Sequence, residues 1–253
     1  MTRLLRAVGA EMLKTRRTLA VWMTVLTPMV VCSIQLVILL RWGKPVGTEK
    51  LDAWKTSISQ CNLLWVLLVL PLFITLETAL LAHAEHAEKQ WKHLFALPVP
   101  RWAFYAAKWL VGAGLVLLGQ IFLVIGEIAI GYLAGWLEPA LGFGPFPPFW
   151  WTVRILSLAY LISLIVLSIH TWVALRFHSF TVAVGVGMAA AVANAMVNSS
   201  EDALHFFPWL LPGNALHHAE AIAWLPWALT VGIVGGIALA VAGGWDVTRR
   251  DVL

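Results

Sequence analysis

The stretch His83-Ala-Glu85-His86-Ala-Glu88 is the part of this sequence that most nearly has the makeup of a metal site. Its two histidines are close enough in sequence to share one face of a helix, and imidazole and carboxylate groups are common zinc ligands. No further ligand converges on them, and the stretch is a charged loop between apolar segments. We therefore favour solvated side chains here and expect no metal site.

Glu77 and Glu127 suggest a different chemistry, because each lies inside a long apolar segment. A carboxylate at the centre of a bilayer costs about 3 kcal/mol on insertion scales, so it usually faces the protein interior or a cavity. Gln35, Gln120 and Asn194 also lie in apolar segments. All five fit either a polar lining of a translocation path or subunit interface, or hydrogen bonds between helices. For Glu77, snorkelling toward the nearby cytoplasmic surface is a further alternative. An ion-coupled transporter or channel would use the two carboxylates as proton or cation sites.

The sequence lacks the motifs of enzymes that bind ATP or hydrolyse substrates. It contains no GxxxxGK phosphate-binding loop and no glycine-rich dinucleotide-binding turn after a strand. It contains neither the HExxH nor the GxSxG motif. We therefore expect no catalytic residues and no cofactor bound by the chain, and a membrane enzyme is the least favoured class.

The composition indicates a membrane protein. The chain has 253 residues, of which 60% are hydrophobic and only 12% are charged. A soluble domain carries about 25% charged residues, so a soluble enzyme, a disordered protein and a disulfide-stapled domain are excluded. Cys32 and Cys61 show no metal-ligand spacing and are interpreted as packing thiols. No basic run with interleaved aromatics is present, so nucleic acid is not an expected partner.

Continuous apolar stretches recur along the chain, each close to the roughly 20 residues that cross a bilayer as a helix. Their continuous hydrophobicity is typical of helices rather than of the alternating strands of a barrel. The sequence therefore predicts an all-α membrane protein with a single transmembrane domain over residues 1–253. Six spans are expected, at 19–40, 62–82, 109–133, 152–175, 179–197 and 225–245.

Residues 1–18, ahead of the first span, predict a basic amphipathic helix. Their apolar side chains are Leu4, Leu5, Val8, Met12 and Leu13. These would form one stripe, with arginine and lysine largely on other faces, as in a helix that lies flat in the membrane interface. The other interpretation is a plain basic flank that orients the first span.

The basic residues also predict an orientation. With both termini in the cytoplasm, 12 of the 17 Lys and Arg residues lie on the cytoplasmic side, in agreement with the positive-inside rule. Many of the 15 Trp residues lie near predicted span ends, where the indole ring suits the headgroup region.

Small residues recur at four-residue intervals in the last two predicted spans. Gly185, Ala189 and Ala193 lie in the fifth span, and Gly232 and Gly236 lie in the sixth. Small residues allow helix backbones to approach closely. We therefore expect tight helix contacts for both spans.

The polar stretch 83–108 predicts a short amphipathic helix on the cytoplasmic side. Its apolar face holds Trp91, Leu94 and Phe95, and a Pro-Val-Pro sequence ends it. The simpler interpretation is a solvated connector with snorkelling lysines. A connector needs no face of aromatic and aliphatic residues, so we favour a docking element for a cytosolic protein.

This stretch also carries a family resemblance. The residues from Gln90-Trp91-Lys92 through Leu97-Pro98-Val99 to Ala107-Lys108 resemble permease subunits of ABC-2 type exporters. The subgroup that they most resemble serves lantibiotic immunity and bacitracin-like peptide export. Residues 1–18 resemble the connecting helix ahead of the first span in those permeases. Residues 206–212 resemble their FPW-x-x-P element before the last span.

The resemblance implies a mechanism. Two permease halves of six helices each, a homodimer or a heterodimer of paralogues, would pair in a bacterial cytoplasmic membrane. A separate cytosolic ATPase subunit would bind ATP and Mg²⁺. The segment 83–97 would be the coupling helix that docks into that ATPase, and 198–223 would be short re-entrant helices on the outer side. The implied cargo is a peptide antibiotic or another hydrophobic compound.

The expected site residues follow from these interpretations. The coupling helix would contact the ATPase through Glu85, Glu88, Lys89, Gln90, Trp91, Lys92, Leu94 and Phe95. The translocation path or subunit interface would use Glu77, Gln120, Glu127 and Asn194. An outer gate would use Phe207, Pro208 and Trp209.

Overall fold

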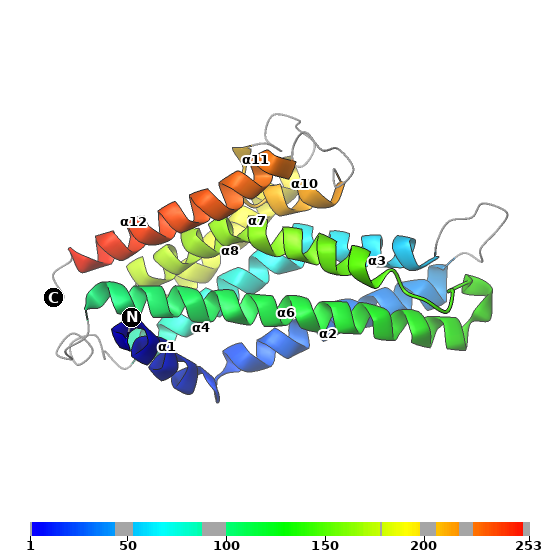
Figure 1. Ribbon diagram of the computed structural model, residues 1–253, viewed down its shortest axis with the longest axis horizontal. Coiled ribbons are helices and arrows are strands. Elements are labelled where there is room, and N and C mark those ends of the chain that lie inside the picture. The colour runs from blue at the N-terminus through cyan, green and yellow to red at the C-terminus, as the bar shows by residue number, and fades with distance from the viewer. Residues whose placement is uncertain are drawn as a thin grey trace.

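The computed structural model describes residues 2–43, 53–87, 100–177, 179–197, 206–217 and 225–249, and in this part of the chain every regular element is a helix (Figure 1). The predicted all-α fold class is thus confirmed. In chain order the elements are α1 (Thr2–Thr15), α2 (Leu19–Trp42), α3 (Ala53–Leu64), η1 (Trp65–Val69), α4 (Leu70–Ala87), α6 (Arg101–Leu137), η2 (Pro139–Leu141), α7 (Phe149–Arg176), α8 (Phe180–Val197), α10 (Leu211–His217), α11 (Leu225–Thr230), η3 (Val231–Gly235) and α12 (Gly236–Thr248).

Five helical stretches among the described residues are long and apolar enough to cross a membrane. They are Leu19–Trp42, Ala53–His83, Arg101–Leu137, Phe149–Arg176 and Leu225–Thr248. A shorter apolar helix covers Phe180–Asn194 within α8. Length and composition therefore support five of the six predicted spans, and the span expected at 179–197 stays a prediction.

The second spanning helix begins earlier than the sequence predicts. α3, η1 and α4 follow one another without a break from Ala53, whereas the predicted span starts at Asn62. Two polar residues of α3 face the protein interior, whereas Lys55, Thr56, Ser59 and Gln60 are exposed. Ser57 and Asn62 are buried, and the side-chain amide of Gln35 in α2 donates to the Ser57 carbonyl (3.4 Å). Average hydropathy does not show that such polar residues are hidden between helices, so the prediction began too late.

α6 runs along the full length of the bundle (Figure 1). It packs against α1, α2, α4, α7 and α12. The core around it contains Trp65, Ile74, Leu123 and Leu156, each at most 2% exposed. Lipid tails are as apolar as these side chains, so close packing, rather than removal from water, holds such helices together.

Several helix ends gather at one end of the bundle. The start of α1, the end of α4, the start of α6 and the end of α12 lie together there, at the left of Figure 1. α1 also packs on the bundle, because Leu4, Ala7 and Val8 contact Ala103 and Ala107 of α6. Three other apolar residues of the predicted stripe are exposed: Leu5, Met12 and Leu13. The stripe is thus divided between a face on α6 and a face that points away from the bundle.

Glycines in the last spanning helix allow close contact with α7. A Cβ at Gly232 would overlap the backbone of Ile162, and Gly236 approaches α7 in the same way. The close contact predicted for the sixth span is thus confirmed. In α8 the close approach is made by Gly187, whereas Gly185, which the spacing pattern singled out, faces open space.

Replacing Gly232 with alanine is expected to destabilise the protein by about 1–3 kcal/mol, because the new Cβ has no room against α7. Gly114→Ala in α6 is the matched control, since open space surrounds Gly114. Alanine there should stabilise the helix by up to about 1 kcal/mol. Thermal unfolding midpoints in one detergent measure both variants, and equal midpoints would contradict the close packing at Gly232.

Candidate functional site

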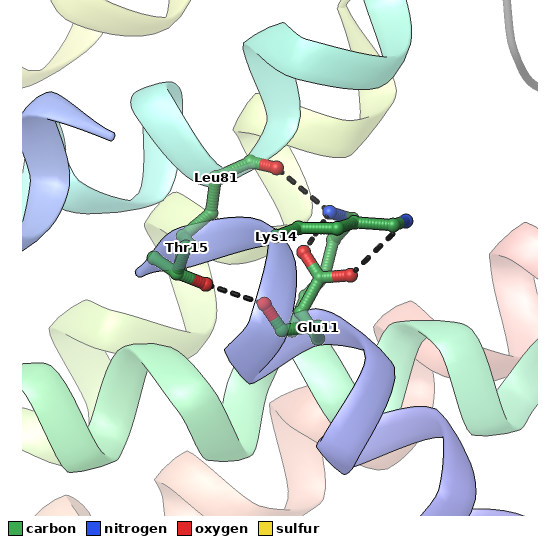
Figure 2. Close-up of polar contacts among 5 residues, drawn as sticks. Glu11, Lys14, Thr15 and Leu81 are labelled. Carbon is green, nitrogen blue, oxygen red and sulfur yellow. Dashed lines mark hydrogen bonds and ion pairs between the residues drawn. The ribbon is translucent and has the colours of Figure 1, made fainter. Parts of the chain in front are cut away.

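A buried ion pair connects α1, α4 and α6 (Figure 2). The Lys108 ammonium of α6 donates to Oε1 of Glu11 in α1, and also to the backbone carbonyl of Leu81 in α4 at 2.7 Å. The side chain of Lys108 is 5% exposed and that of Glu11 is 8% exposed. We call Glu11, Leu81 and Lys108 the three-helix junction, because one ammonium group joins elements that are far apart in the sequence.

Glu11 is also held by its own helix (Figure 2). Its other carboxylate oxygen, Oε2, lies 3.5 Å from the Lys14 ammonium. The Thr15 hydroxyl donates to the backbone carbonyl of Glu11. Residues three and four apart lie on the same face of a helix, so the local sequence from Glu11 to Thr15 places these contacts side by side.

Because the charged groups of the junction are buried, each needs partners that replace its lost hydration. An ammonium or carboxylate group moved out of water loses several kcal/mol of hydration, which an opposite charge and further hydrogen bonds must replace. Glu11 supplies the opposite charge for Lys108. The Leu81 carbonyl supplies a further acceptor, because a carbonyl oxygen has a second lone pair beyond the one used in a helix. Losing either charged residue would take from the other the opposite charge of this buried ion pair.

In the sequence, the junction residues Leu81 and Lys108 lie on either side of the predicted coupling segment, 83–97. Leu81 comes shortly before this segment in α4, and Lys108 follows it in the second turn of α6. Glu85 lies in α4, but its side chain is outside the described part of the structure. The other predicted contact residues, which fall within 88–95, lie outside the described residues.

The metal site weighed at His83 also has no support among the described residues. The His83 ring lies 5.4 Å from the ring of Phe180 in α8, centroid to centroid. No group of three or more His, Cys, Asp or Glu residues in the described part of the chain is placed to hold a metal ion. The side chain of His86 is outside that part.

Glu77 and Glu127 both face the protein interior, as the sequence predicts, but they have different neighbours. Glu77 in α4 is fully buried and accepts a hydrogen bond from the Thr24 hydroxyl of α2 (3.2 Å). Glu127 in α6 is 2% exposed, with Cys32 and Cys61 beside it. Thr24 and Cys32 are about two turns apart along α2, so the two carboxyl groups do not share one site.

The two carboxyl groups differ in how well they are satisfied. One oxygen of Glu77 accepts the bond from Thr24, and the other has no hydrogen-bond partner among the described residues. For Glu127, neither oxygen has a hydrogen bond of regular geometry in that part of the chain, and the polar group nearest at hand is the weakly donating Cys61 thiol. Buried polar groups without partners are rare and costly. Glu127 is therefore the more unusual of the two.

Gln120 and Asn194 form hydrogen bonds between helices, and both bonds go to η1. The Trp65 indole N–H donates to Oε1 of Gln120 (3.1 Å), and Nδ2 of Asn194 donates to the Leu67 carbonyl (2.7 Å). η1 is a π-helical turn, and such turns often occur at functional sites. These contacts connect the middle of the second span, Ala53–His83, to α6 and α8.

The residues predicted as an outer gate lie against α7. The Trp209 indole N–H donates to Nε2 of His170 (3.1 Å), and the ring of Phe207 packs at 5.1 Å from that of Trp209, centroid to centroid. His170 is in the second half of α7 and is buried next to the Thr75 hydroxyl of α4. Pro208 lies between the two aromatic residues in the sequence. This element therefore reaches in between α4 and α7.

Comparison with protein families decides the assignment. The family model for ABC-2 family transporter proteins matches residues 7–194, which is most of the chain. The chain belongs to the ABC-2 transporter family. It is therefore a multi-pass membrane protein and a permease subunit of an ABC transporter, from a family that generally works with a cytosolic ATPase. No curated protein and no solved structure matches it.

Sequence reasoning missed the two charged residues of the junction in this ABC-2 permease subunit. One signal was present, because Glu11 is the only acidic residue in the stretch 1–18, which holds five basic ones. A single carboxylate on a basic helix is a sign of a specific partner. The sequence does not show that this partner is Lys108, which the apolar pattern places at the membrane interface.

Lys108→Met is expected to destabilise the protein by about 3–5 kcal/mol, because the buried carboxylate of Glu11 would lose its ion pair with Lys108 and keep the partly exposed Lys14. The double variant Glu11→Gln/Lys108→Met should be more stable than Lys108→Met alone, since it leaves no buried charge. Lys14→Met is the matched control: the Lys14 side chain is 39% exposed, and losing it should cost at most about 1 kcal/mol.

Thermal unfolding midpoints of Lys108→Met, Glu11→Gln, the double variant and the Lys14→Met control, all in one detergent, measure these effects. If the effects of Glu11→Gln and Lys108→Met simply add in the double variant, the two residues are not coupled.

Proposed function

We propose that this chain is the membrane half of an ATP-driven exporter whose cargo is a peptide antibiotic or another hydrophobic compound. Membership of the ABC-2 family supports a permease subunit. The resemblance of residues 83–108 and 206–212 to permeases of lantibiotic immunity and bacitracin export supports the cargo class. The chain would pair with a second copy or a paralogue in a bacterial cytoplasmic membrane.

The three-helix junction is the observation that carries this proposal. An ATPase that binds the segment 83–97 would move the end of α4 and the start of α6. Lys108 binds both Leu81 and Glu11, so the same movement would reach α1. Packed contacts of this kind shift between discrete arrangements and do not stretch continuously. The junction therefore suits the transmission of force from a separate ATPase to the membrane helices.

The charges at this end of the bundle support a cytoplasmic location for both termini. α1 and the turn after it carry five basic residues. Arg101 begins α6, and Arg249 follows α12. Cytoplasmic flanks of spanning helices are enriched in such residues. ATP and Mg²⁺ would be bound by the partner, because this chain has no phosphate-binding loop.

On the outer side of the membrane, residues 198–223 would close the transport path, with Phe207, Pro208 and Trp209 as the gate. The bond from Trp209 to His170 would hold this element against α7 in the closed arrangement. Gln120, Glu127, Glu77 and Asn194 would line the path or the subunit interface. Of these, Glu127 is the strongest candidate because its carboxyl group has no hydrogen bond of regular geometry among the described residues.

Trp91→Ala and Glu88→Lys, both in the coupling segment, are expected to abolish co-purification of the cytosolic ATPase and to leave the permease folded. A pull-down from native membranes in mild detergent, followed by mass spectrometry and an ATPase assay, measures this. Trp150→Ala is the matched control, because Trp150 is 80% exposed at the start of α7. That variant should keep the partner.

Normal assembly of both coupling-segment variants would contradict the docking role. Isolation of the wild-type protein alone, without associated ATPase activity, would contradict the exporter proposal as a whole. Ion-coupled transport through Glu77 and Glu127 would then be the hypothesis to test.

Glu127→Gln is expected to lower export and to leave both stability and the bound ATPase unchanged, because it removes an ionisable group but keeps its size. Survival of cells exposed to a peptide antibiotic, or efflux of a fluorescent hydrophobic compound, measures export. Glu138→Gln is the matched control, since Glu138 is exposed just after the end of α6. Wild-type export by Glu127→Gln would leave Glu127 with a packing role only.

A further inference from the structure

A groove of about 590 Å³ lies between the start of α6 and the end of α12. It is lined from α6 by Trp102, Tyr105 and Trp109, and from α12 by Ile237, Val241 and Trp245. Its wall is almost entirely apolar. The volume falls within the range of about 300–1,000 Å³ that is typical of sites for small ligands.

Small residues create this space. A Cβ at Gly243 would overlap the Tyr105 hydroxyl, so the glycine lets α12 touch α6 directly at that point. Beside this contact, Ala106 and Ala240 line the groove with methyl groups only. The two helices therefore meet at Tyr105 and leave an apolar slot next to it.

A cationic group lies at one end of the slot. The Arg249 guanidinium stacks over the ring of Trp245, 3.7 Å from its centroid, and the Arg249 side chain is exposed. Trp102 is 48% exposed and Trp245 is 58% exposed. Half-exposed indoles at the ends of spanning helices lie at the level of the lipid headgroups. The groove thus combines an apolar slot, an aromatic rim and a positive charge.

We propose that this groove binds an anionic phospholipid, with an acyl chain between α6 and α12 and the phosphate on Arg249. The apolar wall offers a polar solute almost no hydrogen-bond partners, which argues against a soluble metabolite. Basic residues at a membrane surface attract anionic lipids, so the guanidinium favours an anionic headgroup over a zwitterionic one. The inference depends on the membrane location of the chain and not on its cargo.

Native mass spectrometry tests the charge. The full chain, purified in mild detergent, is supplied with phosphatidylglycerol or with phosphatidylcholine of the same acyl chains. The wild type is expected to retain phosphatidylglycerol preferentially. Arg249→Gln should weaken this retention about fivefold, the effect of one basic residue near the surface. Arg176→Gln, which removes an exposed arginine at the end of α7, is the control and should retain the lipid.

A second pair of variants tests the slot. Ala240→Phe fills the groove and should lose the lipid. Ala238→Phe changes an exposed residue of α12 outside the groove and should keep it. Thermal unfolding checks that both variants are folded. If Ala240→Phe does not fold, lipid binding is tested by Arg249→Gln, which changes an exposed position.

Three results would overturn the proposal: equal retention of the two lipids by the wild type, unchanged retention by Arg249→Gln, or equal retention by the two phenylalanine variants. A wild-type dimer that Ala240→Phe dissociates would also overturn it, because a second copy of the chain would then cover the groove.

Discussion

The Lys108 ammonium group is buried, and the arrangement of α1, α4 and α6 depends on the partners that this charge needs. Its partners, the Glu11 carboxylate and the Leu81 carbonyl, come from two other helices. Separating them would expose an unpaired charge to the protein interior, at a cost of several kcal/mol. α1 is therefore part of the bundle. The contact between Lys108 and Leu81 also joins α4 and α6, the two helices that flank the predicted coupling segment in the sequence.

Polar residues elsewhere in the bundle are of two kinds. Gln120 and Asn194 each form a hydrogen bond between helices, and such bonds favour one packing arrangement over others. The carboxyl group of Glu127 has no such bond of regular geometry within the described residues. A buried polar group without a partner lowers stability, so its presence needs another reason. A role in transport would supply one, whereas Gln120 and Asn194 each make one hydrogen bond and leave one polar atom without a partner among the described residues.

α6 is longer than the predicted span, and it contacts different helices at different points along its length. The apolar pattern predicts a span at 109–133, but the helix runs from Arg101 to Leu137. Its first turns carry Lys108 toward α1 and Tyr105 toward α12. Further along, Gln120 and Glu127 face the second span. The additional turns at its start therefore place the junction and the groove at the same end of the bundle.

The sequence by itself determined that this is an all-helical membrane protein, because a chain in lipid must satisfy its backbone hydrogen bonds within long apolar helices. It also predicted that Glu127 faces the protein interior or a cavity, since lipid does not solvate a carboxylate, and left snorkelling open for Glu77, which the structure buries. Only the tertiary structure decided that Lys108 meets Glu11, 97 positions away, and that Gly187 rather than Gly185 touches α4. Such pairings depend on how each helix is rotated and shifted against its neighbours. Periodicity along a single helix carries no information about that rotation.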